Sequence, residues 1–144
     1  MRARAVFACV VTLSVAVGLW WLRRTWVLVT VEGPSMEPTL HDGDRLAVRR
    51  GRRTAVSAGD VVVIERPMSG VLSPVSAEHR YVIKRVGAVA GEPVPPGIPV
   101  PDRVVPPGKL VLLGDNSAAS FDSRAVGYFA TSDLLGSVVR RVRA

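Results

Sequence analysis

Cysteine, aromatic residues and lysine are scarce in this sequence, and each shortage excludes something. The only cysteine among 144 residues is Cys9, which lies in an uncharged stretch, so we expect no disulfide, no thiolate metal site and no catalytic thiol. Aromatic residues make up 6% of the chain, too few for the mixed basic and aromatic surface that binds single-stranded nucleic acid. His41 and His79 lie in polar, turn-like sequence without a triad or ligand motif, and we expect neither a metal nor a cofactor.

The excess of positive charge is concentrated near one end of the chain. The formal net charge is +7, but four arginines flank an uncharged stretch near the N-terminus: Arg2, Arg4, Arg23 and Arg24. The other 15 basic residues are nearly balanced by 12 acidic ones, so nucleic acid is not an expected partner. A length of 144 residues allows one compact domain with room for one active site.

Residues 5–22 form an uncharged, mainly apolar run of 18 positions. As a helix this run would be about 27 Å long, close to the hydrocarbon thickness of about 30 Å in a bilayer. Tryptophans gather at its C-terminal end, where indole rings favour the headgroup layer, and arginines flank both ends. We predict a membrane anchor in residues 1–24, with its N-terminus in the cytoplasm and residues 25–144 outside the cytoplasmic membrane. A cleavable signal peptide, cut near 16–18, is the alternative.

Beyond this run the sequence predicts a compact, mainly antiparallel β domain. Short β-branched runs alternate with glycine–aspartate turns, and apolar residues at helical spacing are scarce. The predicted strands are 27–31, 45–48, 61–64, 81–89 and 110–113. Seven of the eleven prolines lie in 93–107, which indicates an extended connection or a small edge hairpin. The tail from Arg140 to Arg143 is expected to be a solvated end.

The shortage of lysine draws attention to Lys84. Basic residues are arginine 17 times and lysine only twice, and arginine cannot give up its proton in a protein, whereas a buried lysine can. Lys84 lies in an apolar run where the period of two places it on one face with Val82 and Val86. Burial on that face favours the neutral amine, which is a base that can activate a nucleophile. The other lysine, Lys109, follows Pro-Pro-Gly and is expected to keep its ammonium in water.

Ser35 is the candidate nucleophile. It lies between Pro34 and Pro38, whose rings restrict the backbone on both sides. Without a partner such a serine is typical of a turn, and a lone lysine on a strand can extend its ammonium into water. The two assignments support each other because a basic lysine needs a nucleophile to deprotonate.

Four blocks of the sequence resemble those of the type I signal peptidases, membrane-anchored serine proteases that use a serine and lysine pair to remove signal peptides from exported preproteins. The first two blocks are Ser35-Met36-Glu37-Pro38-Thr39-Leu40 with Gly43-Asp44, and Gly59-Asp60-Val61-Val62-Val63. The last two are Lys84-Arg85-Val86-Gly87-Ala88-Val89-Ala90-Gly91-Glu92, and Gly114-Asp115-Asn116 with Ser120-Phe121-Asp122-Ser123-Arg124 and Gly127. They occur in the family's order between residue 31 and about 138, and the chain is similar to the compact Gram-positive or actinobacterial form.

The resemblance implies a role for particular residues. Ser35 is the expected nucleophile, and Lys84 is the general base that takes its proton and later supplies one to the leaving amine. Ser120 and Asp122 fall where the family places groups that orient the lysine. Asp122 is expected to form an ion pair with Arg124 that fixes the closing block.

Two positions depart from the family's pattern. The oxyanion hole is assigned to the Ser35 amide together with Gly33, where many members carry Ser or Thr as the second donor, so the second donor is unidentified. Ser117 stands where the closing block usually has arginine, which removes a structural contact. Pro34 and Met36, the neighbours of Ser35, are the expected substrate-binding residues.

The expected function is that of a serine endopeptidase that removes signal peptides by cutting after small residues, at Ala-X-Ala sites. Its partners would be signal-peptide-bearing preproteins and the lipid bilayer, and the chain is expected to be a monomer. One alternative is a maturation protease of the same family that is dedicated to one precursor. Another is a membrane-anchored binding protein that keeps the fold without the chemistry.

Overall fold

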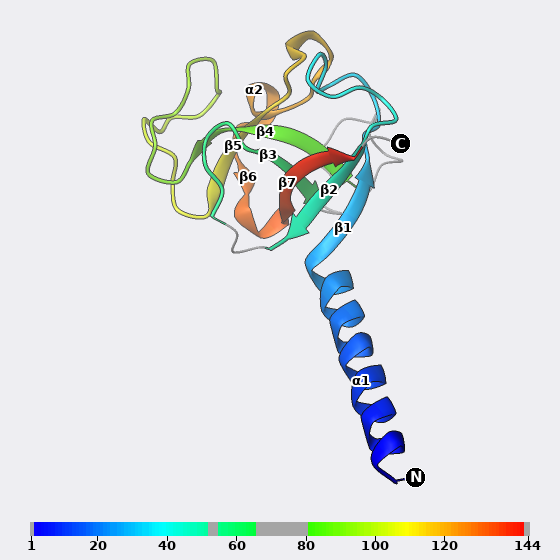
Figure 1. Ribbon diagram of the computed structural model, residues 1–144. Coiled ribbons are helices and arrows are strands. Elements are labelled where there is room, and N and C mark those ends of the chain that lie inside the picture. The colour runs from blue at the N-terminus through cyan, green and yellow to red at the C-terminus, as the bar shows by residue number, and fades with distance from the viewer. Residues whose placement is uncertain (1, 52–54, 66–80, 143–144) are drawn as a thin grey trace.

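The structure is a computed structural model that describes residues 2–51, 55–65 and 81–142, with side chains from residue 11 onward. His79, Arg143 and the side chain of Cys9 therefore lie outside the described part. The described residues form an N-terminal helix followed by a β domain, and the helix projects away from the sheet (Figure 1).

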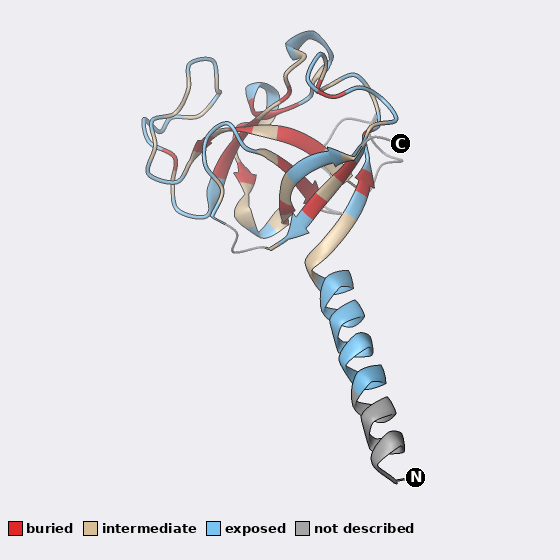
Figure 2. Cartoon of the chain, viewed as in Figure 1, coloured by how far each residue is buried: buried red, intermediate tan, exposed pale blue. Residues whose placement is uncertain are grey.

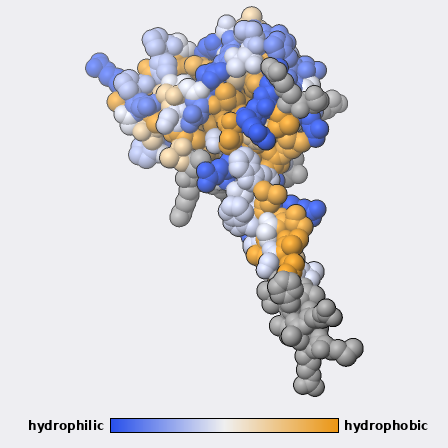
Figure 3. Space-filling view, in the orientation of Figure 1, coloured by the Kyte–Doolittle hydropathy of each residue, from blue (hydrophilic) through white to orange (hydrophobic). Residues whose placement is uncertain are grey.

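The N-terminal helix, α1 (Arg2–Thr25), passes directly into the first strand. The Thr25 hydroxyl donates to the Trp21 carbonyl, one turn back, at 2.8 Å. The guanidinium of Arg24 lies 4.6 Å from the centre of the Trp20 ring. Apolar side chains along the described part of α1 are exposed (Figure 3). Among the described residues, no helix has the length and apolar character needed to cross a membrane.

One antiparallel sheet makes up the β domain, as the sequence predicts. Its seven strands are β1 (Trp26–Thr30), β2 (Arg45–Arg50), β3 (Val61–Glu65), β4 (Tyr81–Val89), β5 (Lys109–Leu113), β6 (Phe129–Ala130) and β7 (Leu134–Val142). They are ordered β1-β2-β7-β3-β4-β5-β6, and every neighbouring pair is antiparallel. Three single-turn helices lie in the connections near the C-terminal end: η2 (Ser117–Ala119), α2 (Ser123–Val126) and η3 (Thr131–Asp133).

Strand β7, which the sequence pattern did not indicate, lies in the middle of the sheet. It pairs with β2 on one side and β3 on the other, so the C-terminal segment joins the two halves of the domain. Arg140 and Arg141, which belong to the expected solvated tail, lie in this strand, and both side chains are exposed. Arg141 also forms an ion pair with Asp44 at 3.1 Å.

The core lies on both faces of the central strands, as the buried segments in Figure 2 show. On β3, Val63 packs into one apolar cluster with residues of β1 and β2, whereas Val62 and Ile64 pack into a second cluster with residues of β4, β5 and β7. A strand that is buried on both faces is expected to be continuously apolar, and β3 reads Val-Val-Val-Ile. Met36 and Leu40 close the first cluster from the loop between β1 and β2.

The proline-rich segment 93–107 forms the small hairpin that the sequence predicts. Pro93 and Val104 form an isolated antiparallel bridge. The Val94 amide donates to the Arg103 carbonyl at 3.0 Å, and the Val105 amide donates to the Glu92 carbonyl at 2.9 Å. Val105 is buried and packs on Ala88 and Val111, so the hairpin covers the outer end of the β4–β5 pair.

Replacing Gly136 by alanine is expected to destabilise the domain. A Cβ atom there would lie 2.0 Å from the Arg49 carbonyl oxygen and 3.0 Å from the Arg50 Cα, both backbone atoms of β2. Because backbone in a central strand pair cannot move aside freely, we expect a loss of at least about 2 kcal/mol in the free energy of unfolding, measured by denaturant titration. The neighbouring change Ser137→Ala is the control, and equal effects of the two variants would contradict the packing argument.

Candidate active site

Three segments of the chain meet at one cleft. They are the loop 31–44 between β1 and β2, the strand β4, and the loop 114–122 that follows β5. The cleft has a volume of about 230 Å³, and its wall includes both Ser35 and Lys84. The loop after β5 contributes Ala119 and Phe121.

The loop that carries Ser35 is closed at its base like a hairpin. The Val31 amide donates to the Asp44 carbonyl at 2.8 Å, and the Gly43 amide returns a bond to the Val31 carbonyl at 2.9 Å. Met36, directly after Ser35, is 1% exposed and packs in the core. The loop therefore holds Ser35 at the surface of the cleft while its next residue anchors the backbone.

The backbone N–H groups of Gly33 and Ser35 differ in whether they donate a hydrogen bond within the chain. Gly33 has a φ of 81°, a left-handed conformation that glycine adopts without strain. Its N–H donates to the Asp42 carboxylate at 2.7 Å, so this amide is already occupied. Among the hydrogen bonds found for the described residues, none uses the Ser35 N–H as donor. Of the two amides assigned to the oxyanion hole, that of Ser35 is the one without an intramolecular acceptor.

Lys84 lies in the middle of β4 and is 3% exposed. It is paired with Val62 of β3, and its neighbours on the same face, Val82 and Val86, pack in the second apolar cluster. The prediction that this lysine is buried among apolar side chains is confirmed. Burial lowers the pKa of Lys84 from 10.5 to about 8; the Asp122 carboxylate acts in the opposite direction, and Arg124 adds to the lowering.

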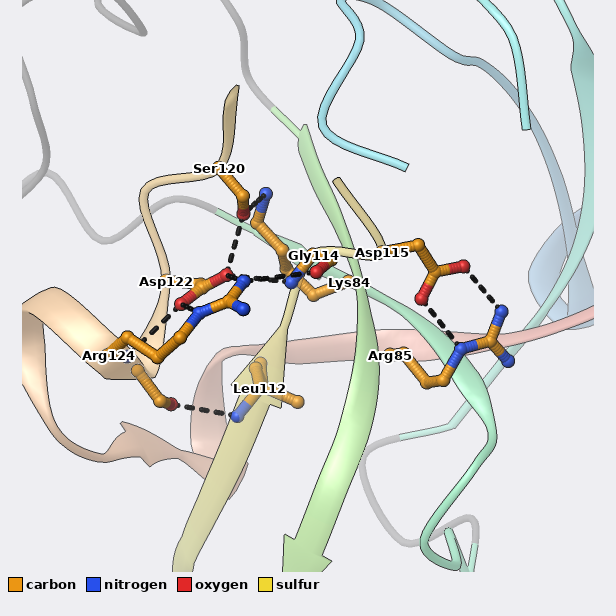
Figure 4. Close-up of polar contacts among 9 residues, drawn as sticks. Lys84, Arg85, Leu112, Gly114, Asp115, Ser120, Asp122 and Arg124 are labelled. Atoms are coloured by element: carbon orange, nitrogen blue, oxygen red, sulfur yellow. Dashed lines mark hydrogen bonds and ion pairs between the residues drawn. The ribbon is translucent and has the colours of Figure 1, made fainter. Parts of the chain in front are cut away.

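A chain of hydrogen bonds runs from Lys84 into the loop after β5 (Figure 4). The Lys84 amine donates to the Ser120 hydroxyl at 2.9 Å, and that hydroxyl donates to the Asp122 carboxylate at 2.7 Å. Because the Ser120 proton is directed at Asp122, its lone pairs are left for the lysine. No hydrogen bond joins Ser35 to Lys84 among the described residues, and the two share the cleft wall.

Asp122 is the buried centre of this chain, with no exposed surface. It accepts from the Gly114 amide at 2.8 Å and from the Arg124 Nε at 3.0 Å, and the predicted ion pair with Arg124 is present. Burial by itself would raise the pKa of Asp122, but the hydrogen bonds from Arg124, Gly114 and Ser120 outweigh it and lower that pKa to about 2. Asp122 is therefore a fixed anion that holds the Ser120 hydroxyl.

Gly114 allows the loop after β5 and the Ser35 loop to approach each other. A Cβ atom at this position would lie 2.1 Å from the Ser120 hydroxyl and 2.6 Å from the Ser35 carbonyl oxygen. The Asn116 amide donates to that same Ser35 carbonyl at 3.1 Å. The serine loop and the lysine-orienting loop are thus in direct backbone contact.

Arg85 braces the site from the other face of β4. Its guanidinium binds the Asp115 carboxylate through two hydrogen bonds, of 2.8 and 2.7 Å (Figure 4). Its third nitrogen donates to the Gly59 carbonyl at 2.8 Å. The hydrogen bond from Arg85 lowers the pKa of Asp115, and the Thr39 side chain of the Ser35 loop adds to this lowering. The sequence placed Arg85 and Asp115 within the matching blocks but gave neither a role. The brace becomes visible because Arg85 pairs with Leu113, the last residue of β5, and Asp115 follows two residues later.

The residues predicted for the site are brought together in two layers. Those that line the cleft are Gly33, Pro34, Ser35, Met36 and Lys84. Ser120, Asp122 and Arg124 lie behind the lysine and are linked to it by the hydrogen bonds described above. Ser117, the departure in the closing block, is exposed at the start of η2. Sequence reasoning gave no role to Asp42, Gly114 and Phe121, although Gly114 and Phe121 lie in the closing block and Asp42 lies in a glycine–aspartate turn.

The sequence of this chain is similar to those of known proteins. The model of the family "Signal peptidase, peptidase S26" matches residues 2–95 and 98–142. Mitochondrial inner membrane protease subunit 1 of Schizosaccharomyces pombe is 35% identical over 118 residues, covering 76% of this chain and 69% of the relative. Signal peptidase IB of Staphylococcus aureus is 25% identical, covering 94% and 88%, and signal peptidase I of Bacillus licheniformis is 29% identical, covering 85% and 80%.

The buried lysine makes stability depend on pH in a defined direction. Below pH 8 Lys84 is protonated in both the folded and the unfolded chain, and burial penalises the folded one. Between pH 8 and 10.5 the folded chain loses this proton while the unfolded chain keeps it, so stability rises with pH, by about 3 kcal/mol in total.

We expect Lys84→Met to lack that gain. The measurement is the free energy of unfolding of the detergent-solubilised chain and the variant between pH 7 and 10.5. Lys109→Met, at an exposed lysine, is the matched control and keeps the wild-type dependence. A difference between wild type and Lys84→Met that stays constant with pH would show that the lysine titrates normally.

Proposed function

Because this chain belongs to the signal peptidase family, peptidase S26, we propose that Ser35 and Lys84 are the residues with which it removes signal peptides. Family membership makes the chain a serine protease that acts on signal-peptide-bearing preproteins. The observation that carries the residue assignment is the shared cleft, in which a buried lysine with a lowered pKa lies on the same wall as a serine.

The proposed reaction begins with proton transfer from the Ser35 hydroxyl to the neutral amine of Lys84. The serine oxygen attacks the scissile carbonyl carbon, and the resulting oxyanion accepts a hydrogen bond from the Ser35 N–H. The C–N bond then breaks as the Lys84 ammonium gives its proton to the leaving amine. Water attacks the acyl-serine after losing a proton to Lys84, and that proton returns to the Ser35 oxygen as the carboxylic product leaves.

Ser120, Asp122 and Arg124 are positioning residues in this scheme. A lysine amine rotates freely about its stem, so its lone pair needs a fixed partner to be aimed at Ser35. The Ser120 hydroxyl supplies that partner at 2.9 Å, and the buried Asp122 carboxylate fixes the hydroxyl. No hydrogen bond joins Ser35 to Lys84 among the described residues. In this scheme the two side chains come closer when substrate fills the cleft.

The cleft also supports a preference for small residues on the acyl side of the scissile bond. Val31, Met36 and Ile83 line it and are themselves buried, at 2%, 1% and 8% exposure, so they form an apolar floor. Such a floor offers an apolar contact to the methyl group of alanine. Cleavage at Ala-X-Ala sites is the specificity that we propose for this cleft.

We further propose that residues 5–22 anchor the chain in the cytoplasmic membrane, with the N-terminus in the cytoplasm and the β domain outside. The support is the uncharged run in the sequence, the flanking arginines and the exposed apolar side chains along α1. A β domain on the outer side would meet preproteins as they emerge from the membrane.

The dyad assignment predicts that single substitutions abolish cleavage. Ser35→Ala removes the attacking oxygen and Lys84→Ala removes the base, and we expect each to lower kcat/KM for a preprotein by at least about a thousandfold. Ser117→Ala and Lys109→Ala change the same residue types at exposed positions outside the cleft and serve as matched controls. Cleavage by the purified, detergent-solubilised chain that survives either of the first two changes would refute the dyad, and an inert wild type would favour a binding protein.

The pH profile of the reaction tests the state of the lysine. Because the neutral amine is the active form, kcat/KM should rise with pH on a limb centred near 8, the lowered pKa of Lys84. At pH 7 the rate constant would then be about a tenth of its plateau value. A limb centred near 10.5, the ordinary pKa of lysine, would contradict a desolvated base.

A further inference from the structure

Phe121 is a large apolar side chain held at the surface beside the catalytic lysine's partner. Its side chain is 39% exposed, whereas Asp122, the next residue, is fully buried. Phe121 is a member of none of the three apolar clusters found among the described residues. It lines the cleft together with Ser35 and Lys84. The ring therefore faces the space that substrate must occupy.

The backbone on both sides of Phe121 is fixed. Ser120 is bonded to Lys84 and to Asp122, at 2.9 and 2.7 Å, and Asp122 accepts from the Gly114 amide at 2.8 Å. Since neither neighbour can move without breaking these bonds, the phenyl ring cannot withdraw into the core. The ring therefore stays beside the cleft as an apolar surface whose attachment point on the backbone is held in place.

The chemistry of the cleavage step decides which side of the substrate lies against this ring. The amine that leaves must take its proton from Lys84, so the residue that carries this amine passes within reach of the lysine Nζ. That atom contacts Ser120, the residue adjacent to Phe121. The acyl side of the substrate is accounted for by the buried floor of Val31, Met36 and Ile83.

We propose that Phe121 is a specificity-determining residue that contacts the first side chain on the leaving side of the scissile bond. It selects preproteins whose mature chain begins with an apolar or aromatic residue, because such a side chain buries its own surface and that of the exposed ring together. This inference rests on the proposed function of Ser35 and Lys84, from which the direction of the substrate follows.

The test uses peptides that are identical on the acyl side, with Ala-X-Ala before the scissile bond, and that carry Phe, Leu or Gly directly after it. For the detergent-solubilised full chain, kcat/KM for the Phe and Leu peptides should exceed that for the Gly peptide by at least about fivefold. Phe121→Ala should reduce this ratio to below about twofold, and Phe121→Leu should retain most of it. Val104→Ala, at an exposed apolar residue outside the cleft, is the control and keeps the wild-type ratio.

Two further measurements separate a direct contact from an effect through the lysine. The pH limb near 8 should be the same in Phe121→Ala as in wild type, and discrimination between acyl-side residues should not change. A ratio that persists in Phe121→Ala, a wild type that does not discriminate, or a limb that moves in the variant would each overturn the proposal.

Failure of this inference and failure of the dyad are distinguishable. The ratio among the three peptides can be read in any active chain, whichever residue is the nucleophile. Binding of the same uncut peptides to Ser35→Ala, with and without Phe121→Ala, gives a second readout that needs no cleavage. Tighter binding of the Phe peptide that disappears with Phe121→Ala supports the contact, and equal binding of all three peptides to Ser35→Ala refutes it.

Discussion

The hydrogen bond between the Lys84 amine and the Ser120 hydroxyl is the contact on which the site depends. It joins residues that are 36 positions apart in the sequence, on β4 and on the loop after β5. At one end this hydrogen bond orients the buried amine of Lys84, whose pKa is lowered to about 8. At the other end it leads to Asp122, a buried anion that accepts from Ser120, Gly114 and Arg124. Without it the amine would have rotational freedom and no direction.

Burying a lysine in an apolar cluster costs stability at neutral pH, and the fold around it supplies compensation. The cluster draws on β3, β4, β5 and β7, and β7 is clamped between β2 and β3. Arg85 and Asp115 tie the strand that carries the lysine to the end of β5, where the orienting loop begins. Burial of Lys84 weakens the fold while the amine is charged, and the same burial makes the neutral amine available as a base.

Much of the domain was accessible from local patterns. Runs of β-branched residues between glycine–aspartate turns located five strands, and the period of two placed Lys84 on a buried face. Strand β7 escaped because Gly136 interrupts its apolar run and arginines crowd its end. It pairs with β2 and β3, and Gly136 allows the close approach to the Arg49 backbone, which no local pattern records. Likewise, no local pattern indicates that the Gly33 amide donates a hydrogen bond to Asp42, nine residues further along the chain.

The sequence alone determined the chemical types and their order: one serine held between prolines, one lysine within an apolar run, and a later block with Ser120, Asp122 and Arg124. These follow from residue identity and short periodicities, which are local properties. The tertiary structure decided that Ser35 and Lys84 share a cleft, that Gly114 lets their loops touch, and that Phe121 stays exposed beside them. Proximity and desolvation are set by strands that pair across the whole chain, and a pKa near 8 exists only once those strands have excluded water from the lysine.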